Sequence, residues 1–290
     1  MNAVDATLQE AIRSAVRELA EAGIASPEAD AVALAAHALG CGPEEVRRRM
    51  ILHAPADAGF TTGFGDLVRE RAARIPLQHL TGVAHFRRLT LSVGPGVFVP
   101  RPETEVVAQA AIDAALLCSP PPLVVDLCSG SGAIALAVSD EVPGARVIAV
   151  ELDPLAMAWA SRNRERSGLP VELLEGDATT ALDDLVGQID VVVSNPPYIP
   201  TGMVPQDPEV RDHDPELALY GGSADGLRIP LAVADRAAIL LRAGGWFVME
   251  HADTHGEVLP ERLRRRGAWT EVCGHRDLAG RPRYVTARRQ

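Results

Sequence analysis

The sequence predicts an α/β domain with a mainly parallel sheet, preceded by a small all-helical domain and a β-hairpin. Three observations support this fold class. From about residue 103 onward, apolar strand-like runs alternate with helical segments, a pattern typical of a parallel sheet with helices on both faces. Residues 3–75 show helical spacing alone, and residues 76–102 show a strand-like alternation between the two regions. We therefore predict three parts: 1–75, 76–102 and 103–290.

Composition narrows the class of protein. Hydrophobic residues make up 47% of the 290 residues, enough for a sizeable core and too many for a disordered chain. The formal net charge of -11 makes direct binding to nucleic acid phosphates unfavourable. The four cysteines form no C-x-x-C pair, so we expect neither a metal site nor a disulfide framework. There is no signal-peptide pattern and no membrane-length apolar run, so we expect a cytoplasmic, monomeric protein without membrane contact.

The leader divides into four predicted helices. Val4, Leu8, Ile12 and Leu19 recur at helical spacing in the first helix. The second is expected to start at Ser26-Pro27-Glu28, with a hydroxyl cap followed by proline, and to end at Gly40. The third opens at Pro43, and the fourth carries Phe64, Leu67, Val68 and Ala72. A leader of this size is too small to be a catalytic core.

The linker is predicted to be a β-hairpin. Leu89, Leu91 and Val93 alternate with polar residues, which indicates a half-buried strand. Gly94-Pro95-Gly96 then predicts the turn, and residues 97–99 the second strand. In the third part, we expect strands over 123–127, 146–150, 171–174, 189–193, 246–249, 269–273 and 284–287, and helices from 133, over 154–166 and over 230–242.

A glycine-containing loop follows the first of these strands. The run Asp126-Leu127-Cys128-Ser129-Gly130-Ser131-Gly132 lets the backbone turn sharply and approach a ligand closely. It fits a dinucleotide site, an S-adenosylmethionine site or a structural turn. Asp126 favours S-adenosylmethionine, because a carboxylate attracts a sulfonium and an ammonium but repels a pyrophosphate. The alternative role for Asp126 is to cap the loop backbone.

Two further acids follow neighbouring strands. Glu151 ends the second strand and is placed to accept hydrogen bonds from both ribose hydroxyls, although it could also be an ordinary solvated strand end. Asp177 follows the third strand and could meet the adenine amino group, although Gly-Asp is also a common turn. Because ligands bind at the carboxyl ends of strands in open α/β sheets, we expect these groups to share one site.

The most specific motif is Asn195-Pro196-Pro197-Tyr198, directly after the fourth strand. Two prolines stiffen the backbone, so that the Asn195 side-chain oxygen and the Pro196 carbonyl can point at one spot as acceptors. An NH2 group has two protons and would satisfy both acceptors, while Tyr198 offers a flat wall to a planar substrate. Fixing a reacting pair in this way can supply up to ~7–11 kcal/mol of the barrier. The motif therefore predicts methyl transfer to an amide or amino nitrogen, with Asn195, Pro196 and Tyr198 as the catalytic residues.

Together with Phe98-Val99-Pro100-Arg101-Pro102-Glu103, these motifs resemble the HemK/PrmC family of protein-(glutamine-N5) methyltransferases. Leu219-Tyr220-Gly221-Gly222 and Gly226-Leu227 also fit that family, and the resemblance covers nearly the whole chain. It implies a class I methyltransferase fold, Rossmann-like with a seven-stranded sheet. It implies S-adenosylmethionine as cofactor, and as substrate the glutamine of the Gly-Gly-Gln motif in class I peptide chain release factors, held partly by the helical leader.

The resemblance also implies site residues. Residues Cys128 to Gly132, Glu151, Ala178 and Asn195 would line the cofactor, Asn195 to Tyr198 the glutamine, and Arg101 and Glu103 the border of the active site. Cys128 stands where the family usually has glycine, and Ala178 is smaller than the usual side chain. We expect Cys128 to pack rather than to act as a reactive thiol.

Three other functions stay open at this point. The target could be a glutamine of a ribosomal protein or the N6 amino group of adenine in a nucleic acid, or the chain could bind the cofactor without catalysis. Two further features are expected to have no chemical role. These are Glu250-His251 with nearby His255, interpreted as structural, and the acidic run 207–216, interpreted as a solvated loop. The alternative for the acidic run is a lid or a contact to a basic partner.

Overall fold

The computed structural model describes residues 7–290, so Val4 of the first predicted helix lies outside it. The chain forms two compact units. One, here called the helical unit, comprises Met1–Val83 and Pro205–His213. The other, here called the sheet unit, comprises Ala84–Val204 and Asp214–Gln290. Each is described by itself.

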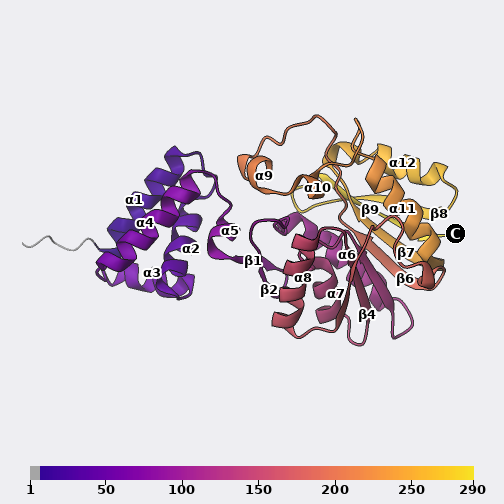
Figure 1. The fold of residues 1–290 in the computed structure, drawn as a ribbon, viewed down its shortest axis with the longest axis horizontal. Coiled ribbons are helices and arrows are strands. Elements are labelled where there is room, and N and C mark those ends of the chain that lie inside the picture. Colours follow the sequence, from indigo (N-terminus) through magenta and orange to yellow (C-terminus); the bar gives the residue numbers. More distant parts are fainter. Residues whose placement is uncertain (1–6) are drawn as a thin grey trace, which may run out of the picture. The chain divides into compact units, whose positions relative to one another are not determined.

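Within residues 7–83, the helical unit contains the four predicted helices and a short fifth one (Figure 1). A capping box begins the first, because the Thr7 hydroxyl accepts from Glu10 N while the Glu10 carboxylate accepts from Thr7 N. Ser26 occupies the N-cap of the second helix, but the expected side-chain hydrogen bond is absent. Gly40 ends that helix in the left-handed conformation, as predicted. The bounds are α1 (Leu8–Glu21), α2 (Pro27–Leu39), α3 (Pro43–Ile51), α4 (Ala58–Ala72) and α5 (Leu77–Thr81).

Part of the acidic run 207–216 belongs to the helical unit. Its interpretation as a solvated loop is wrong for the buried acids Glu209 and Asp214, whereas Asp207, Asp212 and Glu216 are exposed. Glu209 lies in α9 (Pro208–His213) and is only 8% exposed. Its carboxylate accepts from Arg71 Nη1 at 2.7 Å and from Arg74 Nη2 at 2.6 Å, and Arg71 also pairs with buried Asp30 at 2.8 Å. Burial raises the pKa of Glu209, but hydrogen bonds from Asp207, Arg74 and Arg71 outweigh it and bring the pKa to about 2. The pairing with two arginines explains why the Glu209 carboxylate can be buried.

The linker hairpin exists, but its strands are not the predicted pair. Strand β1 (Val83–Phe86) pairs with β2 (Leu89–Ser92), and residues 97–99 form no strand. The turn lies at Arg87, which adopts a left-handed φ of 52° and pairs with Glu141 through its guanidinium. Gly94 is needed for a different reason: a Cβ there would stand 2.6 Å from the Trp159 ring. Gly94 thus allows close packing of an indole, and the Gly94-Pro95-Gly96 segment does not turn a hairpin.

The sheet unit has one seven-stranded sheet in the order β5-β4-β3-β6-β7-β9-β8 (Figure 1). The first five are parallel, and β9 runs antiparallel to both neighbours. The predicted mainly parallel sheet is confirmed. The strand bounds are β3 (Leu123–Leu127), β4 (Arg146–Glu151), β5 (Val171–Glu175), β6 (Ile189–Ser194), β7 (Leu241–Glu250), β8 (Trp269–Arg276) and β9 (Pro282–Arg289).

Successive residues of the central strands bury opposite faces of this sheet. Val124 and Val191 pack with α6 and α7, whereas Val125 and Val192 pack with α11 and α12. Burial on both faces explains why the strands are continuous apolar runs. Helices α6 and α12 were not among the predicted helices. The helices are α6 (Glu105–Leu116), α7 (Ala133–Glu141), α8 (Pro154–Ser167), α10 (Glu216–Leu219), α11 (Arg228–Leu240) and α12 (Val258–Arg265).

The buried ion pairs of the helical unit yield the first prediction. Arg71→Met should lower the local stability of α2 and α4 by about 3–5 kcal/mol, because it leaves the buried Asp30 carboxylate without its cation. Native-state hydrogen exchange of amides in these helices measures the loss. Arg69→Met is the control on the same helix, since its pair with Asp66 is exposed and contributes about 0–1 kcal/mol. Equal effects of the two substitutions would contradict the prediction.

Candidate active site

The predicted site residues gather at the carboxyl edge of the parallel strands. Leu127 of β3 is level with Ser194 of β6, and Glu151 of β4 is level with Glu175 of β5. After β3 the chain adds β4 and β5 on one side and then returns to place β6 on the other. The strand order therefore reverses between β3 and β6, which is where open α/β sheets bind ligands. The glycine loop follows β3, and Asn195-Pro196-Pro197-Tyr198 follows β6.

The loop after β3 is held open by backbone conformation and by hydrogen bonds. Cys128, Gly130 and Gly132 all have positive φ, at 64°, 58° and 81°. A Cβ at Gly130 would meet nothing within 4 Å, so that position is open. Asn163 of α8 donates to the Ser131 carbonyl at 3.0 Å. Cys128 adopts the left-handed backbone with a side chain present, which costs roughly 1–2 kcal/mol and is normally left to glycine.

Cys128 is unsuited to thiolate chemistry. Burial raises the pKa of its thiol, and the negative charges of Glu151 and Asp126 raise it further. The side chain packs against the core cluster that includes Leu127 and Val150. This agrees with the expectation that Cys128 fills space. The other cysteines, Cys41, Cys118 and Cys273, are also free thiols.

Asp126 lies beneath the loop and is fully buried. Its Oδ2 accepts from the Ser129 hydroxyl at 2.7 Å and from Ala135 N at 3.1 Å, so the carboxylate ties the loop to the start of α7. Its Oδ1 is buried without a hydrogen-bond partner among the residues described. Burial raises the pKa of Asp126 to about 7, the Ser129 and Ala135 hydrogen bonds oppose this, and the charge of Glu151 adds to it. Loop capping, the alternative role named for Asp126, is therefore present in the structure, and its attraction for a cationic ligand stays a prediction.

Glu151, the last residue of β4, joins the end of that strand to the glycine loop after β3. Its Oε2 accepts from Gly130 N at 2.7 Å, and its Oε1 accepts from Leu152 N and Asp153 N at 2.8 Å. Burial raises the pKa of Glu151 despite these hydrogen bonds. Glu151 is therefore not an ordinary solvated strand end. Ribose binding by this residue stays a prediction.

Asp177 and Ala178 lie at the end of β5. The exposed Asp177 accepts from Thr179 N and from its hydroxyl at 2.8 and 2.7 Å, which is a turn-capping arrangement. Ala178 is buried in the same cluster as Cys128. The structure thus brings both residues to the predicted edge, and their contact with an adenine ring stays a prediction.

Three hydrogen bonds position the end of β6 and the loop that follows it. Ser194 Oγ donates to the Leu127 carbonyl at 2.6 Å, which joins the end of β6 to the end of β3. Asn195 Nδ2 donates to Thr104 Oγ1 at 3.5 Å, so its Oδ1 is left available as an acceptor. Tyr198 OH donates to Glu250 Oε1 at 3.2 Å, and burial raises the pKa of that phenol, which keeps it neutral. Pro196 and Pro197 are buried.

Residues 219–227 support this loop from behind. Ile199 N donates to the Leu219 carbonyl at 2.8 Å, and Gly221 N donates to the Ile199 carbonyl at 2.9 Å. A Cβ at Gly226 would stand 2.2 Å from the Tyr198 carbonyl, and one at Gly221 would stand 1.9 Å from the Gly226 carbonyl. Glycine is required at both positions because backbones touch there. These contacts explain why glycine occupies positions 221 and 226, which contributed to the family resemblance.

Arg101 and Glu103 border this region within the sheet unit. Arg101 Nη2 donates to Asp214 Oδ2 at 2.9 Å, and its guanidinium lies 5.1 Å from the Phe98 ring centre. Asp214 is only 7% exposed, a second member of the acidic run that is not solvated. Glu103 is exposed. Sequence analysis missed Ser194 and Thr104, although their positions beside Asn195 and Glu103 in the two motifs were a usable signal.

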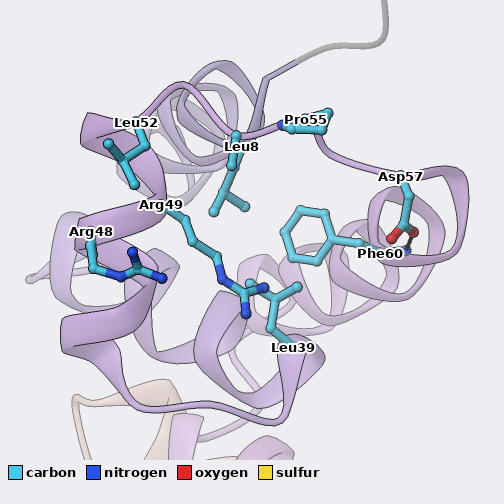
Figure 2. A pocket seen from close by; sticks show the side chains of 9 residues that line it. Leu8, Leu39, Arg48, Arg49, Leu52, Pro55, Asp57 and Phe60 are labelled. Carbon is cyan, nitrogen blue, oxygen red and sulfur yellow. Dashed lines mark hydrogen bonds between the residues drawn. The ribbon is translucent and has the colours of Figure 1, made fainter.

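A separate cavity of about 360 Å³ lies in the helical unit. Figure 2 shows Leu8, Phe60 and Arg49 pointing toward it from α1, α4 and α3. Arg48 and Arg49 pair with Glu45 beside it, and Leu52 at its rim is 63% exposed. The sequence carries no motif for this cavity, because its lining comes from four helices, α1 to α4, and a loop.

Two classes of site are not found within residues 7–290. No group of three or more His, Cys, Asp and Glu side chains there could hold a metal ion. Nor does this described part contain a helix both long and apolar enough to cross a membrane.

Comparisons with known proteins support the fold and the site. The protein-family model of the PrmC N-terminal domain matches residues 10–82, and the family model of the methyltransferase small domain matches residues 108–206. The chain is 50% identical to the release factor glutamine methyltransferase of Streptomyces coelicolor over 96% of both chains. It is 47% identical to that of Mycolicibacterium smegmatis over 97% of this chain and 98% of the relative.

A relative with another printed substrate also matches. The 4-amino-L-phenylalanine/4-methylamino-L-phenylalanine methyltransferase of Streptomyces pristinaespiralis is 38% identical over 94% of this chain and 92% of its own. Among solved structures, T. thermophilus 16S rRNA N2 G1207 methyltransferase (RsmC) has a TM-score of 0.51 at 23% identity. It covers 72% of this chain and 50% of that chain. The ribosomal protein L11 methylase of Lactobacillus delbrueckii subsp. bulgaricus has a TM-score of 0.50 at 18% identity, covering 72% and 98%. These two likenesses concern the fold.

The sheet order, the glycine loop after β3 and the Asn-Pro-Pro-Tyr loop after β6 define a class I methyltransferase. Within that class, the chain belongs to the HemK/PrmC family of release factor glutamine methyltransferases. Its cofactor is S-adenosylmethionine. The residues present fit this group, because a buried acid with an unpartnered oxygen and a second acid lie beside an open glycine. Such a site attracts a cation.

The raised pKa of Asp126 yields a prediction for cofactor binding. With a pKa of about 7, its carboxyl group is about half protonated at pH 7. A sulfonium favours the ionised form of Asp126, so cofactor binding should lower this pKa and release up to about half a proton at pH 7. Cofactor affinity should therefore increase as the pH rises from 6 to 8. Calorimetry in buffers of different ionisation enthalpy counts the protons. S-adenosylhomocysteine, whose sulfur is neutral, should release fewer; equal counts for both ligands would refute the role assigned to Asp126.

Proposed function

We propose that this protein transfers a methyl group to the side-chain amide nitrogen of the glutamine in the Gly-Gly-Gln motif of class I peptide chain release factors. The observation that carries the proposal is the orientation of Asn195 at the strand switch point. Its amide nitrogen is engaged by Thr104, so its oxygen is free to accept. The printed activity of the relatives that match along nearly the entire chain supports the choice of substrate.

The acceptor pair addresses the difficulty of the reaction. An amide nitrogen is a weak nucleophile because its lone pair is delocalised into the carbonyl. Asn195 Oδ1 and the Pro196 carbonyl would each accept one N–H of the substrate amide. This holds the nitrogen in line and stabilises positive charge as it forms on that nitrogen. The buried prolines keep both acceptors from turning away.

The remaining groups exclude water and remove charge. S-adenosylmethionine supplies an electrophilic methyl group carried on a positively charged sulfur. Tyr198, fixed through its hydroxyl to Glu250, would cover one face of the planar amide. No strong base is required beside the nitrogen, because the methylated amide nitrogen is acidic and loses its extra proton to water. Catalysis by Asn195 therefore does not require a basic partner.

The site residues keep the assignments made from the sequence. We infer that Cys128 to Gly132, Glu151, Asp177, Ala178 and Asn195 surround the cofactor. We infer that Asn195 to Tyr198 contact the glutamine and that Arg101 and Glu103 border it. Asp126 acts on the cofactor from beneath the loop. A release factor is the proposed partner, and the chain is expected to act as a monomer.

Labelling tests the proposed activity. Wild-type protein, labelled S-adenosylmethionine and a purified class I release factor should give one methyl group on the Gly-Gly-Gln peptide, located by mass spectrometry. Asn195→Ala should lower kcat by about 10²–10³-fold, because one preorganised acceptor is lost, while cofactor affinity changes little. A release factor whose target glutamine is replaced by alanine is the substrate control. Label on 4-amino-phenylalanine, a ribosomal protein or adenine, with none on the release factor, would reject the proposal.

We further infer that the helical unit contacts the protein substrate. Its cavity has an apolar floor at Leu8 and Phe60 and a guanidinium rim at Arg48 and Arg49, and the adjoining Ile51 and Leu52 are 76% and 63% exposed. Exposed apolar side chains beside a hollow are typical of protein contact sites.

The corresponding prediction concerns substrate affinity alone. Leu52→Asp should raise KM for the release factor by about 10-fold, which corresponds to ~1.4 kcal/mol of lost contact, and leave kcat and cofactor affinity unchanged. Initial rates against release factor concentration measure the change. Leu278→Asp, at a 98% exposed leucine of the sheet unit, is the control and should have no effect. An unchanged KM for Leu52→Asp would exclude this surface.

A further inference from the structure

Glu250 is the last residue of β7 and lies at the level of the active-site loop. Ser194 of β6 is paired with Met249, so the next residues along these parallel strands, Asn195 and Glu250, leave the sheet side by side. Glu250 is only 2% exposed. A carboxyl group buried to this degree normally has a partner that requires it. The sequence analysis interpreted Glu250 as structural only.

The contacts of Glu250 reach both polar side chains of the motif. Its Oε1 accepts from Tyr198 OH at 3.2 Å, and its Oε2 is buried without a hydrogen-bond partner among residues 7–290. The hydroxyl of Thr104, 4% exposed at the start of α6, is adjacent to this carboxyl group and accepts from Asn195 Nδ2 at 3.5 Å. One carboxyl group therefore accepts from Tyr198 directly and lies next to Thr104, the residue that contacts Asn195.

Hydrogen-bond direction gives this arrangement a chemical meaning. A hydroxyl has one proton, so a Thr104 that donates to ionised Glu250 must present its oxygen to Asn195. Asn195 then has to offer its NH2 to Thr104 and its oxygen to the substrate. Without the carboxylate, Thr104 can donate to Asn195 instead. The amide would then turn over and present two N–H donors to the substrate NH2, which repels it.

We propose that Glu250 is a positioning residue for methyl transfer, holding the Tyr198 ring and, through Thr104, the acceptor orientation of Asn195. This inference rests on the proposed function for the identity of the substrate. The Glu250 carboxylate touches neither the substrate amide nor the cofactor in this scheme. Its effect should therefore appear in kcat and in the conformation of Asn195, and should be small in cofactor affinity.

The ionisation of Glu250 adds a pH dependence. Burial raises its pKa to about 7, whereas Thr104, the charge of Arg283 and Tyr198 lower it and the charge of Glu103 raises it. These groups come from η1 (Pro102–Thr104), from β9 and from the loop after β6. The orienting form is the ionised one, so kcat at saturating cofactor should rise as pH increases through about 7. Saturation removes the contribution of Asp126, which acts on binding.

The test compares kcat, affinity and amide orientation in one set of variants. Glu250→Gln should lower kcat about 10–100-fold, abolish the rise near pH 7 and leave the dissociation constant of S-adenosylmethionine within about twofold. Thr104→Val should lower kcat in the same direction, because it removes the relay hydroxyl. Glu257→Gln, at an exposed glutamate just after β7, should behave as wild type. Wild-type kcat in Glu250→Gln would overturn the proposal.

A measurement without substrate separates this inference from the proposed function. The chain has three asparagines, so ¹⁵N-asparagine labelling gives three side-chain NH2 signals, and Asn195→Asp assigns the one from the site. That signal should move in Glu250→Gln and Thr104→Val and stay fixed in Glu257→Gln. If wild-type protein methylates no release factor, the proposed function fails while this readout still decides the role of Glu250. An unmoved Asn195 signal in folded Glu250→Gln would refute the positioning role.

Discussion

The active site depends on the alignment of two adjacent strand ends, β3 and β6. Parallel pairing sets Leu127 level with Ser194, and the Ser194 hydroxyl joins the two ends through the Leu127 carbonyl. From that point, one chain turns through the glycine loop and the other through a pair of prolines. A shift of one residue in the pairing would exchange the faces of β6 and bury Asn195 differently. The register thus fixes the distance over which a methyl group could pass.

Three acids with raised pKa values lie under or beside this edge: Asp126, Glu151 and Glu250. Desolvation is the largest cause in each, so the fold stabilises these carboxylates less than water does. Asp126 and Glu151 face the loop where a cationic cofactor is expected. A bound cation would offset part of the desolvation penalty of these two carboxylates. Glu250 serves the other loop, where hydrogen-bond direction matters more than charge. Buried carboxylates with raised pKa values would therefore serve both loops, through cofactor binding at one and side-chain orientation at the other.

The sequence predicted those features that depend on local chemistry. The strand–glycine–helix order and the Asn-Pro-Pro-Tyr motif each determine their local backbone conformation. The sequence therefore located the loops after β3 and β6 at the correct residues. The hairpin was misplaced because Val97 and Val99 are as apolar as strand residues but pack around Trp159 and Ala156. The burial of Glu209 depends on Arg71, 138 residues earlier in the chain, which no spacing rule can connect. The inward orientation of Asp126 was likewise hidden, because a strand-end acid can face either the ligand or the loop.

The relatives are named for substrates of two kinds. A relative at 38% identity is named for an aromatic amine, whereas those at 47–50% are named for a glutamine. The amide of glutamine and the amino group of 4-amino-phenylalanine both present an NH2 on a planar system, so the acceptor pair and the flat tyrosine proposed for this chain would suit either. We therefore propose that discrimination in this chain comes from outside the four-residue motif. In this chain the sheet unit offers Arg101, fixed by Asp214, and the helical unit offers an apolar cavity with a cationic rim. A small amino acid has no surface to fill an apolar cavity of this size, so the cavity of the helical unit is the feature that the proposed contact with a folded protein substrate would use.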